Sequence, residues 1–104
     1  MWITTDGMAE NLGANDGAWV VETEGPSRGL AKQFLSGPVG CEICGPEFTP
    51  DNRTFFVAIQ HPGGDEKTST MDQPTSRWPD YKSDMPPRPS VVAIYRTDGG
   101  KVGT

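Results

Sequence analysis

The chain has 104 residues, a length that corresponds to one domain at most. Leu, Ile, Val and Phe together make 18 residues, about 17% of the chain, so little apolar side-chain volume is available for a core. The net charge of −5 argues against nucleic-acid binding, for which clustered positive charge is expected. No apolar run is long enough to span a membrane, and residues 1–6 lack the basic region of a signal peptide.

Short apolar runs between turn residues predict β-strands along most of the chain. The most helix-like stretch, residues 27–35, contains Gly29 and is interpreted as a loop followed by a short strand. In chain order, the expected strands are residues 2–5, 17–23, 32–35, a strand of 41–44 and 47–49 broken at Gly45-Pro46, 53–60, 90–96 and a short last edge at 101–103.

One segment departs from this pattern. Residues 62–89 contain six prolines and almost no aliphatic side chains, which predicts a long Pro-rich loop insertion. Loops of this length are usually functional or mobile. Because the segment contains Trp78 and Tyr81, we expect residues 76–80 to dock on the rest of the molecule.

A repeat becomes visible when the strands are aligned. Residues 2–7 and 17–25 match residues 56–63 and 90–99. Each unit reads as strand, irregular loop, strand, turn and short strand, and the second unit adds a leading strand at residues 41–49. We therefore predict an all-β fold of antiparallel four-stranded blades of a β-propeller. The chain holds roughly one to two such blades, whereas closure needs about four to eight. Residues 1–104 are thus predicted to be a piece of a larger propeller, or to need a partner with which to pair.

The two cysteines have the C-x-x-C spacing, at Cys41 and Cys44. A structural zinc site needs two further ligands, and a redox dithiol is typical of a helix N-terminus, which the pattern does not predict. On an extended chain the two side chains point to opposite faces. Packing as small apolar residues is therefore the favoured interpretation.

Four residues are candidates for binding or chemistry. Glu42 lies among apolar residues and glycines, where a carboxylate is costly unless it is paired with Arg53 or Lys32 or binds a metal. His61 ends a strand beside a glycine loop, which suits either a ligand site or a capped surface position. Asp6 is interpreted as an acid that closes a turn and that also suits a cation. Arg77 is interpreted as a residue that either binds an anion or packs against its neighbours.

The stretch 37–63 reads GPVGCEICGPEFTPDNRTFFVAIQHPG and resembles the C-terminal part of the PhoX-type alkaline phosphatases. The flanking motifs occur in the same order as in that family, so the resemblance covers essentially the whole chain. The matching flanks are residues 5–7, 15–17, 76–80 and 88–92.

This resemblance implies a propeller-like enzyme that hydrolyses phosphate monoesters with calcium and iron in its central channel. It also implies export through the twin-arginine route to the periplasm. Glu42 matches an acidic residue near the metals, whereas Val39 and Gly40 stand where a phosphate-binding Arg is expected. The substrate would be a small phosphate ester, and the partners of this chain would be the remaining blades upstream.

Two other classes of function stay open. The chain is alternatively a non-catalytic β-meander that serves as an interaction module, or a fragment of a calcium-dependent propeller lactonase. In the phosphatase interpretation, the chain alone is expected to lack useful activity, because one blade supplies only one or two of the carboxylates that a metal cluster needs.

Overall fold

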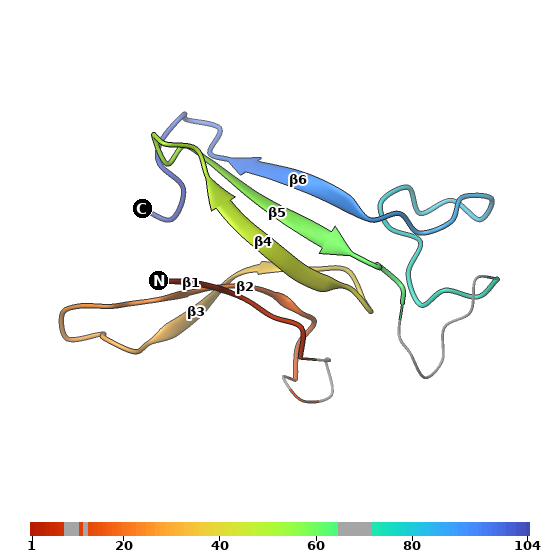
Figure 1. The fold of residues 1–104 in the computed structure, drawn as a ribbon, viewed down its shortest axis with the longest axis horizontal. Helices are drawn as coiled ribbons and strands as arrows, with labels where there is room; N and C mark the ends of the chain where they lie inside the picture. Colours follow the sequence, from red (N-terminus) through yellow and green to blue (C-terminus); the bar gives the residue numbers. More distant parts are fainter. Residues whose placement is uncertain (8–10, 12, 65–71) are drawn as a thin grey trace.

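The computed structural model describes residues 1–7, 11, 13–64 and 72–104. Its elements are two antiparallel three-stranded sheets, which confirms the all-β prediction (Figure 1). The first sheet has the order β1-β2-β3 and the second the order β4-β5-β6. The strands are β1 (Trp2–Thr4), β2 (Gly17–Val21), β3 (Ala31–Ser36), β4 (Glu42–Phe48), β5 (Thr54–Gln60) and β6 (Ser90–Tyr95).

These strands agree with the predicted positions, with small differences at their ends. The break expected at Gly45-Pro46 is a shift in the β4–β5 register between Cys44 and Glu47. Residues 101–103 form a turn rather than the expected last strand. There, Val102 N donates to Asn52 O at 2.9 Å, and the Val102 side chain joins the core. Each described sheet therefore has three strands, one fewer than the predicted four-stranded blade.

The repeat appears in the structure as two equivalent hairpins. In the first, Trp2 lies opposite Val20, and in the second, Phe56 lies opposite Ala93. β1 and β5 run in the same direction, so the two strands end at the same end of the molecule (Figure 1). In the first sheet the hairpin is followed by β3, whereas in the second it is preceded by β4.

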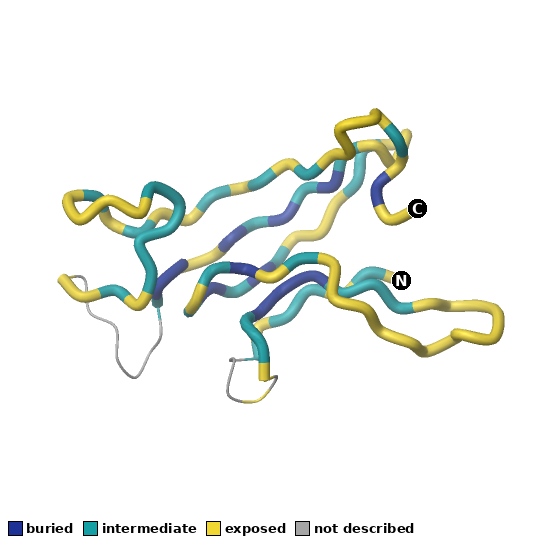
Figure 2. The backbone as a smooth tube through the Cα atoms, turned by 180° about the vertical axis from the view of Figure 1, so that it is seen from behind, coloured by how far each residue is buried: buried dark blue, intermediate teal, exposed yellow. Residues whose placement is uncertain are grey.

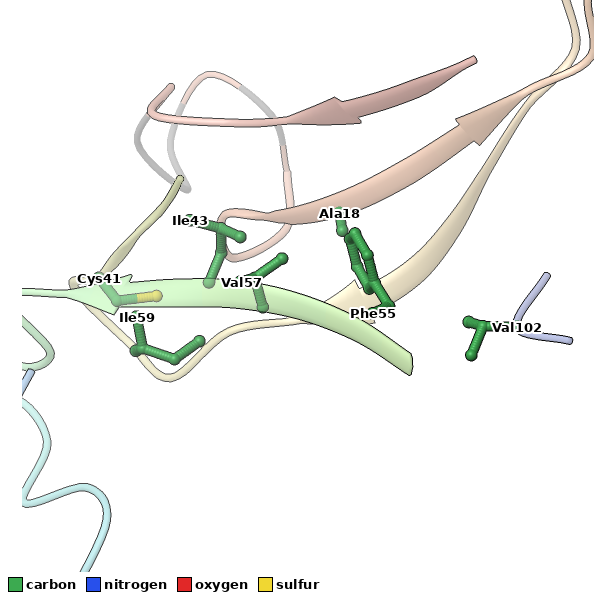
Figure 3. Packing of buried hydrophobic residues seen from close by; sticks show 7 residues of the cluster. All are labelled: Ala18, Cys41, Ile43, Phe55, Val57, Ile59 and Val102. Atoms are coloured by element: carbon green, nitrogen blue, oxygen red, sulfur yellow. The ribbon is translucent and has the colours of Figure 1, made fainter. Parts of the chain in front are cut away.

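The core lies between the two sheets and is small. Alternate residues of β5 supply most of it, namely Phe55, Val57 and Ile59, as expected for a half-buried strand (Figures 2 and 3). From the first sheet, Ala18 is buried against them. The radius of gyration is 15.2 Å, against about 13 Å for a compact 100-residue domain, so the chain is more extended than a compact domain of this length.

The ring of Trp2 joins the two sheets. It lies 4.8 Å from the ring of Phe55 and 5.1 Å from that of Phe48, both in the second sheet. It also makes an edge-to-face contact at 4.9 Å with Phe34 of β3. A Cβ on Gly103 would press on the Trp2 ring, so the C-terminal turn covers this side chain closely.

Replacing Trp2 with Ala is expected to lower the free energy of unfolding by about 3 kcal/mol, because a large aromatic contact between the sheets is lost. Urea denaturation followed by far-UV circular dichroism measures this change. Tyr81→Asn is the matched control, since Tyr81 is 69% exposed and its positive φ of 52° suits Asn. Equal midpoints for the two variants would contradict the central role of Trp2.

Candidate functional site at the loop end of the sheets

The ends of strands from both sheets meet at one edge of the molecule, which we call the loop end. β4 begins at Glu42, directly opposite Gln60 at the end of β5. The end of β1 reaches the start of β4 through a hydrogen bond from Ile43 N to Thr5 O at 3.2 Å. Asp6 follows β1, so the topology brings this acid, Glu42 and the residues after β5 to the same end.

Glu42 is held by two side chains from the end of β5. Gln60 Nε2 donates to Glu42 Oε2 at 2.6 Å, and His61 Nε2 lies 3.6 Å from the same oxygen. The Glu42 side chain is 21% exposed, so it neither points into bulk water nor is fully enclosed. Because both contacts use Oε2, the described residues leave Oε1 without a hydrogen-bond partner.

The ion pair considered for Glu42 from the sequence is not the one that the structure shows. Lys32 Nζ lies 3.8 Å from Glu22 Oε1, on the edge strand β3. Arg53 ends the turn before β5, where its backbone N donates to Asp51 Oδ1 at 3.1 Å. Glu42 therefore contacts His61 and Gln60 instead of the expected Lys32 or Arg53.

His61 is oriented by the backbone. Its Nδ1 lies 3.1 Å from Gly40 O, and because a carbonyl oxygen only accepts, Nδ1 must carry the hydrogen. The other ring nitrogen, Nε2, is the one that faces Glu42 Oε2. His61 has a φ of 34°, which turns the chain sharply at the end of β5 and allows its carbonyl to accept from Gly64 N at 2.9 Å.

Gly63 fastens the long loop to this site. Gly63 N donates to Val39 O at 2.8 Å, and a Cβ on Gly63 would collide with the backbone oxygen of Ser76. Its φ of 73° also favours glycine. The described part of the loop, residues 72–89, is thus attached next to Glu42, and Trp78 packs against the core. This confirms the predicted docking of residues 76–80.

Arg77 holds the loop in shape. Its Nη1 donates to Met85 O at 3.0 Å and its Nη2 to Asp72 O at 3.1 Å. Two of its donors are therefore directed to backbone oxygens of its own loop. Nearby, Arg88 and Asp80 form an ion pair of 2.6 Å across the same loop. A role for Arg77 in binding phosphate stays a prediction.

The acids in the turns mostly close those turns through backbone hydrogen bonds, as expected. Asp16 is buried, and its Oδ1 accepts from Gly7 N at 2.8 Å. Asp98 Oδ1 accepts from Gly100 N at 2.9 Å, and the adjacent Arg96 guanidinium holds the pKa of this carboxyl well below its usual range. Asp6 is exposed at the loop end and stays a candidate.

Cys41 lies beneath the loop end, and Cys44 lies on the opposite face of β4, as the sequence predicted. Burial, and to a lesser extent the carboxylate of Asp16, raises the pKa of the Cys41 thiol to about 11. The thiol thus stays protonated near neutral pH and behaves as a small apolar residue. Within the part of the chain that the structure describes, no group of three or more His, Cys, Asp or Glu side chains could hold a metal ion.

Sequence reasoning missed Gln60 as a member of the site. The only signal was its register position, since the residue at the end of β5 faces the residue that begins β4. A strand-end Gln next to a candidate ligand on the neighbouring strand is therefore worth including in such a search.

Two antiparallel three-stranded sheets with a small core between them define an all-β chain. The family profile of alkaline phosphatase PhoX matches residues 1–63. A solved structure, "Pseudomonas fluorescens PhoX in complex with vanadate, a transition state analogue", is 40% identical with a TM-score of 0.77. The chain belongs to the PhoX alkaline phosphatase family.

The match covers 98% of the present chain but 17% of the Pseudomonas chain, so the chain spans about one sixth of that protein's length. A search of curated proteins found no match. Among the described residues, no helix is long and apolar enough to cross a membrane.

Gly63→Ala is expected to release the loop, because the new methyl group meets the Ser76 backbone and the positive φ is strained. Gly25→Ala is the matched control, since Gly25 has the same φ of 73° but open space around its Cβ position. We expect Gly63→Ala to cost roughly 1–3 kcal/mol more than the control. Tryptic cleavage after Lys82 should become faster in Gly63→Ala only, and equal rates in both variants would contradict the attachment.

The two thiols should differ in reactivity. A pKa of about 11 instead of 9.0 lowers the thiolate fraction of Cys41 roughly a hundredfold near neutral pH. Iodoacetamide should thus label Cys44 first and Cys41 only after denaturation, and mass spectrometry of peptides distinguishes them. In Cys44→Ala the fast reaction should disappear. Equal labelling rates for the two thiols in the folded chain would overturn the assignment of Cys41 as a packing residue.

Proposed function

We propose that this chain is part of a metal-dependent phosphomonoesterase, in which it supplies two neighbouring sheets and one carboxylate of the metal site. The observation that carries this proposal is the Glu42–His61 pair at the loop end of a chain that is 40% identical to PhoX. That relative binds vanadate as a transition-state analogue, which suits an enzyme that transfers a phosphoryl group.

Glu42 suits a hard cation as one ligand among several. A carboxylate with one oxygen unpartnered among the described residues is the donor that calcium prefers, and calcium takes about 6–8 oxygen ligands. Because the described residues hold no cluster of three ligands, the other donors would come from elsewhere in the full enzyme. By family resemblance the metals are calcium and iron, which when bound neutralise phosphoryl oxygens and lower the pKa of a coordinated water.

The neighbours of Glu42 have positioning roles in this proposal. Gln60 fixes the carboxylate by donating to Oε2, which leaves Oε1 available as a ligand atom in this proposal. His61 presents Nε2 beside the same carboxylate and is itself fixed by the Gly40 carbonyl. The chain's own contribution is thus an oriented oxygen ligand with an imidazole next to it, and His61 and Asp6 are further candidates for contacts with the metal or the phosphate.

The substrate and the cellular location follow only from the family. The proposed substrate is a small phosphate ester, and the proposed location is the periplasm or the outside of the cell. The remaining sheets of the propeller would complete the site, because the chain spans only 17% of the relative's length. The isolated chain is therefore expected to show no useful phosphatase activity.

A chimera tests the role of Glu42. The present chain replaces the matching segment of Pseudomonas fluorescens PhoX, and the hydrolysis of p-nitrophenyl phosphate is measured with calcium and iron present. Glu42→Gln should lower kcat/KM at least about tenfold, because it removes a charged metal ligand. Glu47→Gln is the matched control, since Glu47 is an exposed acid on the same strand.

Metal content measured by mass spectrometry, together with circular dichroism, distinguishes the loss of a metal ligand from unfolding of the variant. We expect Glu42→Gln to bind less metal at unchanged far-UV circular dichroism. Equal activity and metal content in the two variants would contradict the ligand role. Hydrolysis by the isolated chain at the rate of full-length PhoX would contradict the proposal that the chain supplies only part of the site.

A further inference from the structure

Cys44 lies on the same face of the second sheet as Glu42 and Gln60. Alternate residues of a strand share a face, and the β4–β5 register places Glu42 opposite Gln60 and Cys44 opposite Ala58. Cys44 is therefore the diagonal neighbour of Gln60, at a separation that a long side chain can reach. Cys44 Sγ donates to Gln60 Oε1 at 3.6 Å. The two cysteines of the C-x-x-C spacing thus have different surroundings, since Cys41 is buried in the core.

The side-chain amide of Gln60 joins Cys44 to Glu42. Its Nε2 donates to Glu42 Oε2 at 2.6 Å, while its Oε1 accepts from the thiol. An ionised carboxylate only accepts, so the amide can serve Glu42 only with Nε2 on that side. Turning the amide over would set its Oε1 against the carboxylate, with two acceptors facing each other. The two contacts therefore favour the same orientation of the amide.

Gln60 benefits from a second contact because of its position. It is the exposed last residue of β5, and a long polar side chain at such a place has many accessible rotamers. Cys44 has a single side-chain torsion, and its backbone belongs to the β4–β5 ladder. The thiol is therefore a well-placed anchor for an amide that would otherwise rotate more freely.

We propose that Cys44 is a positioning residue for the metal site and acts on Glu42 through Gln60. The inference rests on the proposed function, in which Glu42 is a metal ligand. Partners that orient a metal ligand by a hydrogen bond are worth about tenfold to a hundredfold in metal affinity. A thiol is a weak donor and stands one step further from the metal, so its removal is expected to cost less, about threefold.

Calcium binding by the chimera with Pseudomonas fluorescens PhoX tests this role. The chimera and its variants are depleted of calcium, and the dissociation constant for calcium is measured by titration calorimetry with the thiols kept reduced. Gln60→Met, which keeps the length of the side chain but lacks the amide, should weaken calcium binding at least about tenfold. Cys44→Ala should weaken it about threefold, and Cys44→Ser should restore most of this loss, because a hydroxyl also donates. Glu47→Gln, on the same strand, is the control that should leave the affinity unchanged.

A double variant distinguishes positioning through Gln60 from a general effect on the structure. If Cys44 acts through Gln60, adding Cys44→Ala to Gln60→Met should cause no further loss of calcium affinity. A further loss of about threefold in the double variant would overturn the inference, because Cys44 would then act by another route. Far-UV circular dichroism checks the folding of each variant, and Cys44→Val, which also lacks a donor, replaces Cys44→Ala if that variant unfolds.

The same titrations distinguish failure of this inference from failure of the proposed function. Unchanged calcium affinity in Glu42→Gln would contradict the ligand role of Glu42, and the positioning role of Cys44 with it. Weakened binding in Glu42→Gln together with wild-type binding in Cys44→Ala would overturn the positioning role alone and leave the ligand role intact.

Discussion

The contact of Trp2 with three phenylalanine rings is the interaction on which this structure depends. It is made by the second residue of the chain, yet it joins both sheets, since Phe34 belongs to the first and Phe48 and Phe55 to the second. With only seven buried apolar side chains among the described residues, this aromatic cluster provides much of the contact between the layers. The relative position of the two sheets follows from it.

The loop end depends on that relative position. The backbone hydrogen bond from Ile43 to Thr5 forms only when the first sheet lies against the second, and it places the start of β4 beside the end of β1. Glu42 then stands opposite Gln60 through the β4–β5 register. The packing of the sheets, the attachment of the long loop at Gly63 and the orientation of the carboxylate are thus parts of one arrangement.

The outer face of β5 and β6 is also apolar, although the chain contains few apolar residues. Two large side chains of β6, Val91 and Tyr95, are exposed on this face. The equivalence of Phe56 with Trp2 explains this placement, because each sheet of a repeat is built to receive one neighbour and to pack onto another. The exposed face of the second sheet is therefore equivalent, in the repeat, to the face of the first sheet that packs into the core.

The sequence by itself determined the strands, the break in β4, the opposite directions of Cys41 and Cys44 and the family, because alternation, turn residues and motif order are local properties of a chain. It also selected Glu42 and His61, since a carboxylate among apolar residues and a strand-end imidazole are recognisable locally. Only the tertiary structure decided that these two side chains meet, that Gln60 joins them and that Lys32 pairs with Glu22 instead. Register and sheet packing set such contacts between residues distant in sequence, and a local pattern carries no information about which distant residue will stand opposite.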